Sequence, residues 1–322
     1  MIGSGALRRE PDVPQPIILD CDPGHDDALA ILLARGCPDV DLLAITTVAG
    51  NQTLDKTTLN ARRVCTAAGI TDVPIYPGCD RPLIRPQIVA ADVHGDSGLE
   101  GPAFGEATVQ AQDEHAVDYL VRTLMASDGE ITLVPVGPLT NIAMAARREP
   151  RIVPRVRQVV LMGGSYTRGN RNPAAEFNII ADPDAAAVVF AAGWPLTMVG
   201  LDLTHQAVAS RQVFDEIRAL GTPLGDAVVA MLEFFRERYR TVVGMESPPI
   251  HDPCAVARVA RPELVSVRDA FVAIETRGEW TSGMTVTDFR GALGHPINAQ
   301  VATDLDVDGF WALMLDALRA LG

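Results

Sequence analysis

Short apolar segments alternate with amphipathic ones along the first half of the chain. PIILDCD (16–22) has the apolar run of a buried strand, DDALAILLARG (26–36) has the spacing of a helix, and DLLAITTVAG (41–50) predicts a second strand. A strand, a helix and a strand in this order form a β-α-β unit, in which the two strands run parallel. The chain therefore begins with the repeating unit of an α/β fold.

The same alternation continues into the middle of the chain. ITLVPVG (131–137), QVVLMGG (158–164) and PLTMVGLDL (195–203) predict strands, and LTNIAMAARR (139–148) and DPDAAAVVFAAG (182–193) predict helices. Strands that are apolar on both faces are typical of a parallel sheet covered by helices. We therefore predict a single α/β domain with a mostly parallel central sheet flanked by helices.

The last third of the chain combines both patterns. Residues 205–250 predict helices, including a long segment at 227–243, whereas DAFVAIETRG (269–278) predicts a strand and DGFWALMLDALRAL (308–321) a C-terminal helix. The Pro- and Gly-rich stretch at 73–105 predicts loops. In parallel sheets ligands bind at the carboxyl ends of the strands, so we expect these loops to cover a site there.

Composition excludes several classes of protein. The 322 residues include 27 basic and 41 acidic ones, and the net charge of −14 disfavours nucleic acid and anionic membranes as partners. No segment offers the ~20 apolar residues of a membrane-spanning helix, and residues 1–15 contain no signal-peptide core. We expect a flexible lead-in over 1–15 and one domain over 16–322. Five scattered cysteines, without a CxxC pair, are typical of a reducing cytoplasm.

Four carboxylates lie close together where the first predicted strand turns into the first helix. Asp20 and Asp22 end the strand, and Asp26 and Asp27 follow a Pro-Gly turn. Two carboxylates about 4 Å apart repel by about 1 kcal/mol in water and about 4 kcal/mol near a protein surface. Oxygen ligands without cysteine favour Ca²⁺ or Mg²⁺ over zinc. Helix capping would also explain Asp26 and Asp27, but the nearby Asp22 favours a metal site.

The segment DCDPGHDD (20–27) resembles the signature of the inosine-uridine nucleoside hydrolase family. The resemblance extends over nearly the whole chain and implies a Rossmann-like nucleoside hydrolase fold, with the site at the carboxyl ends of the strands. The other segments that resemble the family, in the same order, are TTVAGN (46–51), HGDSGL (94–99), LVPVGPLTNIA (133–143), LMGG (161–164), AEFNIIADPDAA (175–186), LDLTHQ (201–206) and HDPCAVA (251–257).

This resemblance implies hydrolysis of the N-glycosidic bond of ribonucleosides, giving ribose and a free base. It implies that Ca²⁺ is held by the carboxylates of Asp22, Asp27 and Asp252 and by the backbone carbonyl of Val136. Asp22 is expected to act also as the general base towards a metal-activated water. Because this water attacks directly, we expect inversion at the anomeric carbon.

A second group of residues matches the positions at which the family binds ribose. Sugar hydroxyls require such carboxylates and amides, because an unmet polar group in a closed pocket costs about 1–3 kcal/mol. For the segment AEFN (175–178), an alternative is that it caps the helix near Asp182 or supports a loop. The matching residues are Asp26, Asn51, Met162, Asn170, Glu176 and Asn178.

The resemblance also gives candidates for the leaving base. His251 is expected to act as the acid towards the base, and His94 is expected to lie near it. Tyr239, on the long helical segment, is expected to close the pocket as part of a mobile lid. The remaining histidines are expected to be structural: His25, His115, His205 and His295.

Base preference follows less directly from the sequence. None of Trp194, Trp280 and Trp311 is placed to stack on a purine, and His94 and His251 resemble the broad-specificity branch that accepts inosine and uridine. Preference for pyrimidine nucleosides remains an open alternative. The family also suggests a homotetramer or a dimer.

Two other functions are compatible with parts of the pattern. A phosphorylase would need arginines or a glycine-rich loop at the strand ends, where this chain has acids. A non-catalytic protein that binds Ca²⁺ or ribose would keep the acids but lose the groups that serve the base. His251 favours the hydrolase over this second alternative.

Overall fold

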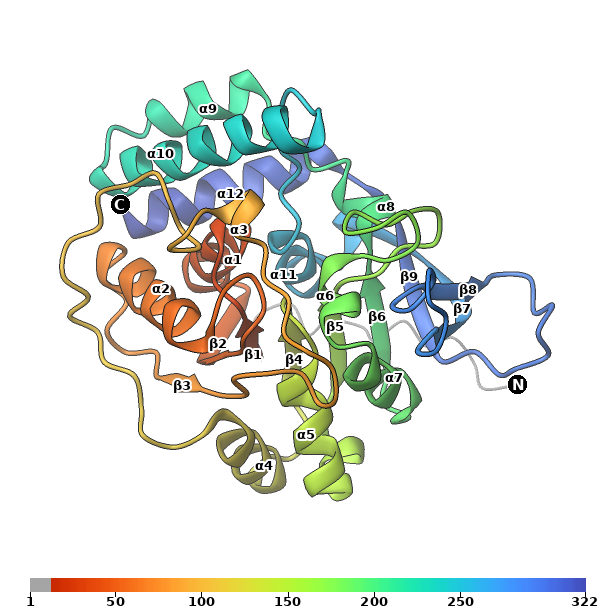
Figure 1. The fold of residues 1–322 in the computed structure, drawn as a ribbon. Helices are drawn as coiled ribbons and strands as arrows, with labels where there is room; N and C mark the ends of the chain where they lie inside the picture. Colours follow the sequence, from red (N-terminus) through yellow and green to blue (C-terminus); the bar gives the residue numbers. More distant parts are fainter. Residues whose placement is uncertain (1–12) are drawn as a thin grey trace.

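A computed structural model describes residues 13–322, so most of the expected lead-in lies outside the described residues. Within this range nine strands form one sheet in the order β3-β2-β1-β4-β5-β6-β9-β7-β8 (Figure 1). Neighbouring strands from β3 to β9 run parallel, whereas β7 is antiparallel to both β9 and β8. The predicted α/β fold with a mostly parallel central sheet is confirmed.

The elements have the following bounds. The strands are β1 (Gln15–Cys21), β2 (Val40–Thr47), β3 (Ile75–Pro77), β4 (Thr132–Pro135), β5 (Gln158–Met162), β6 (Leu196–Val199), β7 (Val265–Ile274), β8 (Thr285–Asp288) and β9 (Ala299–Leu305). The α-helices are α1 (His25–Gly36), α2 (Leu54–Ala67), α3 (Ala91–His94), α4 (Ala116–Ala126), α5 (Thr140–Arg148), α6 (Phe177–Ala181), α7 (Pro183–Ala191), α8 (Leu201–Thr204), α9 (Arg211–Arg218), α10 (Pro223–Arg238), α11 (Pro253–Ala260) and α12 (Val307–Leu321). Shorter turns are the 3₁₀ helices η1 (Pro150–Arg155) and η3 (Pro262–Leu264) and the π-helical η2 (Tyr239–Val243).

The central strand β1 is apolar because both of its faces are covered. Ile17 and Leu19 pack into one core with α1, α2 and α9 to α12, whereas Ile18 packs into the opposite core with α4, α5 and α7 (Figure 1). All three side chains are fully buried. Burial of each such side chain stabilises the fold by about 1.5–3 kcal/mol, so this strand is held in the interior of the sheet.

The strand predicted over 195–203 is too long. β6 ends at Val199, and α8 begins at Leu201. The backbone of Gly200 lies so close to the neighbouring loop that an added Cβ would meet the carbonyl oxygen of Gly164 at 2.8 Å. Leu201 also donates its backbone N–H to that oxygen. The apolar pattern continued past the point where this contact turns the chain out of the sheet.

The long helical segment predicted at 227–243 is present but is not uniform. α10 ends at Arg238 and passes directly into η2, after which Gly244 takes a φ of 82°. Tyr239 therefore lies at the junction of two helical geometries. Among the described residues, no helix has the length and apolar character required to cross a membrane.

Candidate active site

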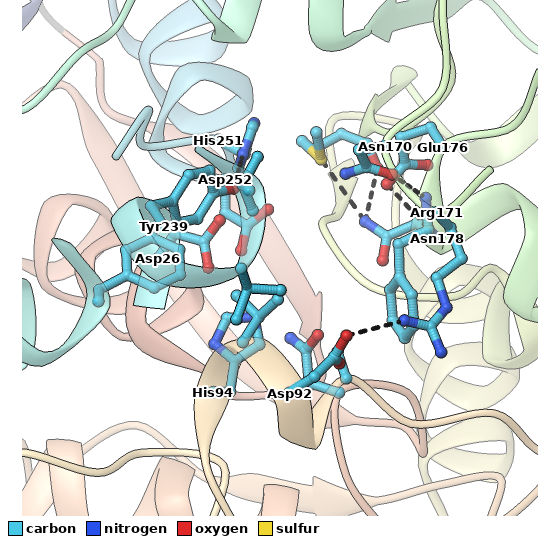
Figure 2. Close-up of a pocket in the computed structure, with 18 of the residues that line it drawn as sticks. Asp26, Asp92, His94, Asn170, Arg171, Glu176, Asn178, Tyr239, His251 and Asp252 are labelled. Atoms are coloured by element: carbon cyan, nitrogen blue, oxygen red, sulfur yellow. Dashed lines mark hydrogen bonds and ion pairs between the residues drawn. The ribbon is translucent and has the colours of Figure 1, made fainter. Parts of the chain in front are cut away.

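A cavity of about 340 Å³ opens beside the carboxyl ends of β1, β2, β4 and β5 (Figure 2). Parallel pairing brings these strand ends to one edge of the sheet, so residues distant in sequence meet there. Two predicted metal ligands, Asp22 and Asp27, are not in the lining and are fully buried. The predicted site residues that line the cavity are Asp26, Asn51, His94, Val136, Met162, Asn170, Glu176, Asn178, Tyr239, His251 and Asp252.

Two carboxylates in one wall of this cavity crowd against a third that lies outside the lining. One oxygen from each of Asp26, Asp27 and Asp252 lies within 4.8 Å of the other two, and all three residues are buried. Asp27 is held by the turn before α1, because its Oδ1 accepts from the backbone N–H of Asp22 at 3.0 Å and its Oδ2 from that of Gly24 at 2.9 Å. Burial, followed by repulsion from Asp27, raises the pKa of Asp26 to about 8. This wall is therefore short of positive charge.

Asp22 lies directly beside these carboxylates in a tight cradle. Its Oδ2 accepts from the backbone N–H of Asn51 at 2.6 Å, whereas its buried Oδ1 has no hydrogen-bond partner among the described residues. A Cβ at Gly50 would lie 2.1 Å from Oδ2, and one at Gly137 would lie 2.4 Å from Oδ1. An orphaned carboxylate oxygen beside three other carboxylates fits a cation ligand or a proton acceptor.

The donor set fits a hard divalent cation. All of the side-chain atoms available as metal ligands are carboxylate oxygens. Val136, whose backbone carbonyl is the fourth predicted ligand, lines the same cavity. The compact group contains Asp26 together with Asp27 and Asp252, although the sequence assigned Asp26 to the sugar. The predicted role of Asp22 as a ligand stays a prediction.

Asp20 lies outside the compact carboxylate group and is bonded to two neighbouring side chains. Its Oδ1 accepts from Thr46 Oγ1 at 2.5 Å and from Asn141 Nδ2 at 2.7 Å. Burial still raises the pKa of Asp20 to about 7. These bonds tie β1 to β2 and α5, so Asp20 has a structural role.

The opposite wall is built on a helix cap. Glu176 is the N-cap of α6: its Oε1 accepts from the backbone N–H of Asn178, and its Oε2 accepts from those of Ile179 and Gly164 at 3.1 and 3.0 Å. Asn178 in turn donates to the carbonyl of Val136 at 2.7 Å. The capping alternative is thus correct for Glu176, at α6 rather than near Asp182. Glu176 nevertheless lines the cavity, so one side chain serves both purposes.

His251 is held between two hydroxyl groups. Its Nδ1 lies 2.7 Å from Thr204 Oγ1, and its Nε2 lies 2.8 Å from the hydroxyl oxygen of Tyr239. Burial lowers the pKa of His251 to about 3 and raises that of Tyr239, so both groups are neutral near pH 7. A neutral imidazole donates from one nitrogen and accepts at the other, which makes a continuous hydrogen-bonded chain that ends at the cavity.

His94 lines the cavity with His25 behind it. The two Nδ1 atoms lie 3.1 Å apart, and His25 Nε2 donates to the carbonyl oxygen of Glu100 at 2.8 Å. His25 also stacks on Phe235 with ring centroids 5.0 Å apart. His25 is absent from the lining, as expected for a structural histidine, and it supports the ring that faces the cavity.

Sequence reasoning missed several residues of the lining. Phe235 on the buried face of α10, Asp92 on the short α3 and Arg171 on a loop were not singled out, because none of them lies in a motif that indicated the site. Thr204, which bonds His251, carried no signal beyond its place in the motif LDLTHQ. None of the three tryptophans, all among the described residues, lines the cavity. The remaining unforeseen lining residues are Ala90, Val93, Phe177, Val242 and Val243.

Comparison with known proteins agrees with this geometry. The model of the family described as "Inosine-uridine preferring nucleoside hydrolase" matches residues 17–312. Over 303 residues the chain is 48% identical to the pyrimidine-specific ribonucleoside hydrolase RihB of Escherichia coli O17:K52:H18 (strain UMN026 / ExPEC), covering 94% of this chain and 96% of the relative.

Solved structures of such enzymes share the fold. A purine-preferring ribonucleoside hydrolase from Gardnerella vaginalis has a TM-score of 0.89 at 33% identity, covering 95% of this chain and 98% of its own. A plant nucleoside hydrolase has a TM-score of 0.89 at 30% identity, covering 95% and 99%. The expected resemblance is confirmed, and the chain belongs to the inosine-uridine preferring nucleoside hydrolase family.

Proposed function

We propose that this nucleoside hydrolase acts on pyrimidine ribonucleosides and uses Ca²⁺ as its metal. The observation that carries the proposal is the buried group of Asp26, Asp27 and Asp252 on one wall of a nucleoside-sized cavity, opposite Glu176 and Asn178. The sequence favoured broad specificity and left pyrimidine preference open. The 48% identity to a pyrimidine-specific enzyme favours that alternative.

The acidic wall would hold the metal. We assign Asp22, Asp27, Asp252 and the carbonyl of Val136 as ligands, with Asp26 close enough to share either the cation or a sugar hydroxyl. Bound Ca²⁺ lowers the pKa of water and so makes it a better nucleophile. Asp22 accepts the proton of the attacking water, because its Oδ1 has no other donor among the described residues. The C1′–N bond breaks as the C1′–O bond forms, with inversion.

The opposite wall would orient the sugar. Asn178 keeps its Oδ1 for a hydroxyl while its Nδ2 is bonded to Val136. Asn170 accepts from the backbone N–H of Phe177 at 2.9 Å, so its amide N–H groups remain for the 5′ end of the ribose. Both side chains are preorganised by these bonds, which reduces the entropy lost on binding.

The chain of Thr204, His251 and Tyr239 would serve the departing base. A base that leaves as an anion is stabilised by a proton or hydrogen bond in the transition state. Because His251 is neutral, its share in this step is to pass a proton along the chain rather than to store one. The link between Tyr239 and His251 adds a chemical role to the lid role that was expected for Tyr239.

Broad specificity for inosine and uridine is the second candidate. It is favoured by the 33% identity to a purine-preferring enzyme of the same fold. It is also favoured by the open, partly apolar rim at Val242 and Val243, whose side chains are about half exposed. A larger base could extend towards this rim without displacing a buried group.

A panel of five nucleosides tests both candidates. Release of reducing sugar from uridine, cytidine, inosine, guanosine and adenosine is measured with Ca²⁺ and after exhaustive chelation. We expect cleavage of uridine and cytidine that is lost with the metal and restored by Ca²⁺. Comparable rates on inosine would favour broad specificity, and full turnover after chelation would refute the metal assignment. Inactivity on all five would favour a non-catalytic binding protein.

We also propose that the enzyme is cytoplasmic and forms a tetramer or dimer. The five cysteines, all free in the structure, and the family resemblance support these assignments. Light scattering coupled to size-exclusion chromatography measures the assembly directly. A monomeric mass would contradict the oligomer.

A further inference from the structure

An ion pair joins α3 to the loop between β5 and α6 at the edge of the cavity. Arg171 Nη1 lies 3.2 Å from Asp92 Oδ2, and both residues belong to the lining (Figure 2). Arg171 comes from the loop between β5 and α6, next to Asn170, whereas Asp92 comes from α3, the short helix that also contains His94. The pair therefore connects the wall assigned to the sugar with the loop that covers the site.

Both partners are fixed by contacts outside the pair. The backbone carbonyl of Asp92 accepts from Arg238 Nε at 2.8 Å, which ties α3 to the end of α10. The backbone N–H of Arg171 donates to the carbonyl of Ala175 at 3.2 Å, which closes its own loop. The side chains of Arg171 and Asp92 are 37% and 47% exposed. Removing one partner thus leaves a partly solvated charge rather than a buried one.

Arg171 is the single Lys or Arg side chain in the cavity lining formed by the described residues. The lining also contains the two histidines His94 and His251, which are neutral because burial lowers the pKa of each. The other ionisable groups of the lining are the phenol of Tyr239 and the four carboxyl groups of Asp26, Asp92, Glu176 and Asp252. A guanidinium in this position would bind a phosphate through two parallel hydrogen bonds, but one of its nitrogens is engaged by Asp92.

We propose that the Asp92–Arg171 pair is a specificity determinant that excludes nucleosides bearing a 5′-phosphate. The inference rests on the proposed function, which places the 5′ end of the ribose beside Asn170. Asp92 neutralises the cation that would accept the phosphate, and its own charge repels a phosphate dianion. A neutral 5′-hydroxyl meets neither obstacle. The pair thereby separates nucleosides from nucleotides at the same catalytic centre.

Hydrolysis of a nucleoside 5′-phosphate would form and break the same bonds as hydrolysis of a nucleoside. Water forms the C1′–O bond, the C1′–N bond breaks, one proton passes to the base, and the phosphate stays on the sugar. The products would be ribose 5-phosphate and a free base. No further reactant is needed, so the discrimination depends on binding alone.

The test compares kcat/KM for uridine 5′-phosphate and for uridine in Asp92→Asn, Arg171→Gln and the double variant. Asp92→Asn removes the repelling charge and frees Arg171. We therefore expect the ratio of kcat/KM for uridine 5′-phosphate to kcat/KM for uridine to rise about tenfold over that of the unsubstituted enzyme. The double variant should lose most of this gain, because the freed cation is then absent. Added salt should reduce the gain, since the pair is half exposed.

Glu114→Gln is the matched control. It breaks the Glu114–Arg122 ion pair, which is also partly exposed at 2.7 Å but lies at α4 outside the cavity lining. This variant should leave the ratio unchanged. Two results would overturn the inference while leaving the proposed function intact. In the first, Asp92→Asn cleaves uridine but its kcat/KM ratio is unchanged. In the second, the ratio rises as much in the double variant as in Asp92→Asn. Failure of the unsubstituted enzyme to cleave any nucleoside would overturn both.

Discussion

On one side of the cavity Asp26 and Asp252 share a small volume with Asp27, whereas on the other side Glu176 accepts three backbone N–H groups by itself. Figure 2 shows Asp26 and Asp252 across the cavity from Glu176. Both walls bury carboxylates, and burial raises the pKa on both, to about 7 for Glu176 and about 8 for Asp26. The sugar wall supplies its own donors. The acidic wall requires a cation from outside, so the two walls should respond in opposite ways to loss of a charge.

Asp252→Asn gives the largest expected effect. Loss of a ligand should reduce kcat/KM by about 10³-fold or more, because a bound metal contributes several kcal/mol to such reactions. The same change removes one of the mutually repelling charges, so the Tm of the calcium-free protein should not fall. Scanning calorimetry with and without Ca²⁺ measures this. A lower Tm in the calcium-free variant would contradict the description of this wall as short of positive charge.

His251→Ala separates proton transfer from metal binding. The residue next to it, Asp252, keeps its place in the cluster, so the rise in Tm caused by Ca²⁺ should be retained. Turnover should fall by about 10²–10⁴-fold, the usual contribution of general acid–base help. His205→Ala is the control, because that ring lies near His251 at 5.6 Å between centroids but outside the lining. Equal losses in both variants would point to a packing effect.

Glu176→Gln tests the opposite wall. One carboxylate oxygen becomes an NH₂ group that cannot accept from the backbone of α6, so the free energy of unfolding should fall by about 1–3 kcal/mol. This fall in the free energy of unfolding should be the same with and without Ca²⁺. For Asp252→Asn, in contrast, no loss of stability is expected in the calcium-free protein. Urea unfolding in both conditions measures it. A loss that appears only with Ca²⁺ would assign Glu176 to the metal instead.

Tyr239→Phe gives the smallest expected effect. It removes one hydrogen bond, worth about 0.5–1.5 kcal/mol, and keeps the aromatic ring against Phe235. If the hydroxyl serves the leaving base, kcat should fall by about two- to tenfold with little change in KM. Tyr239→Leu, which also removes the ring, provides the comparison for a lid role. Unchanged kinetics in Tyr239→Phe would show that the hydroxyl has no part in the reaction and that the residue serves only in packing.

The parts of the fold that depend on strand patterning could be predicted from the sequence. β1, β2, β4 and β5 are largely apolar, so their place in a parallel sheet, and the edge at which Asp22, Asn51, Val136 and Met162 meet, followed from the rules of parallel sheets. β6 was extended too far because Leu201 and Leu203 continue its apolar pattern. The close approach of Gly200 to another loop, which ends the strand, is not encoded in local hydrophobicity.

The site was predictable where residues lie close in sequence and less so where loops converge. Asp22, Asp26 and Asp27 share one turn, and their spacing alone indicated a cation. The bond between His251 and Tyr239, and the pair of Asp92 with Arg171, join segments that no periodicity relates. Glu176 was assigned to the sugar by resemblance, and its capping of α6 emerged as a second role from the backbone N–H groups around it.

The cradle around Asp22 has a consequence for redesign of the enzyme. Any side chain at position 50 or 137 would collide with a carboxylate oxygen, so random libraries at these two positions would consist almost entirely of inactive clones. The rim at Val242 and Val243 is about half exposed, and neither residue belongs to the carboxylate cluster. Diversity aimed at new bases belongs there, and the two glycines are best left fixed.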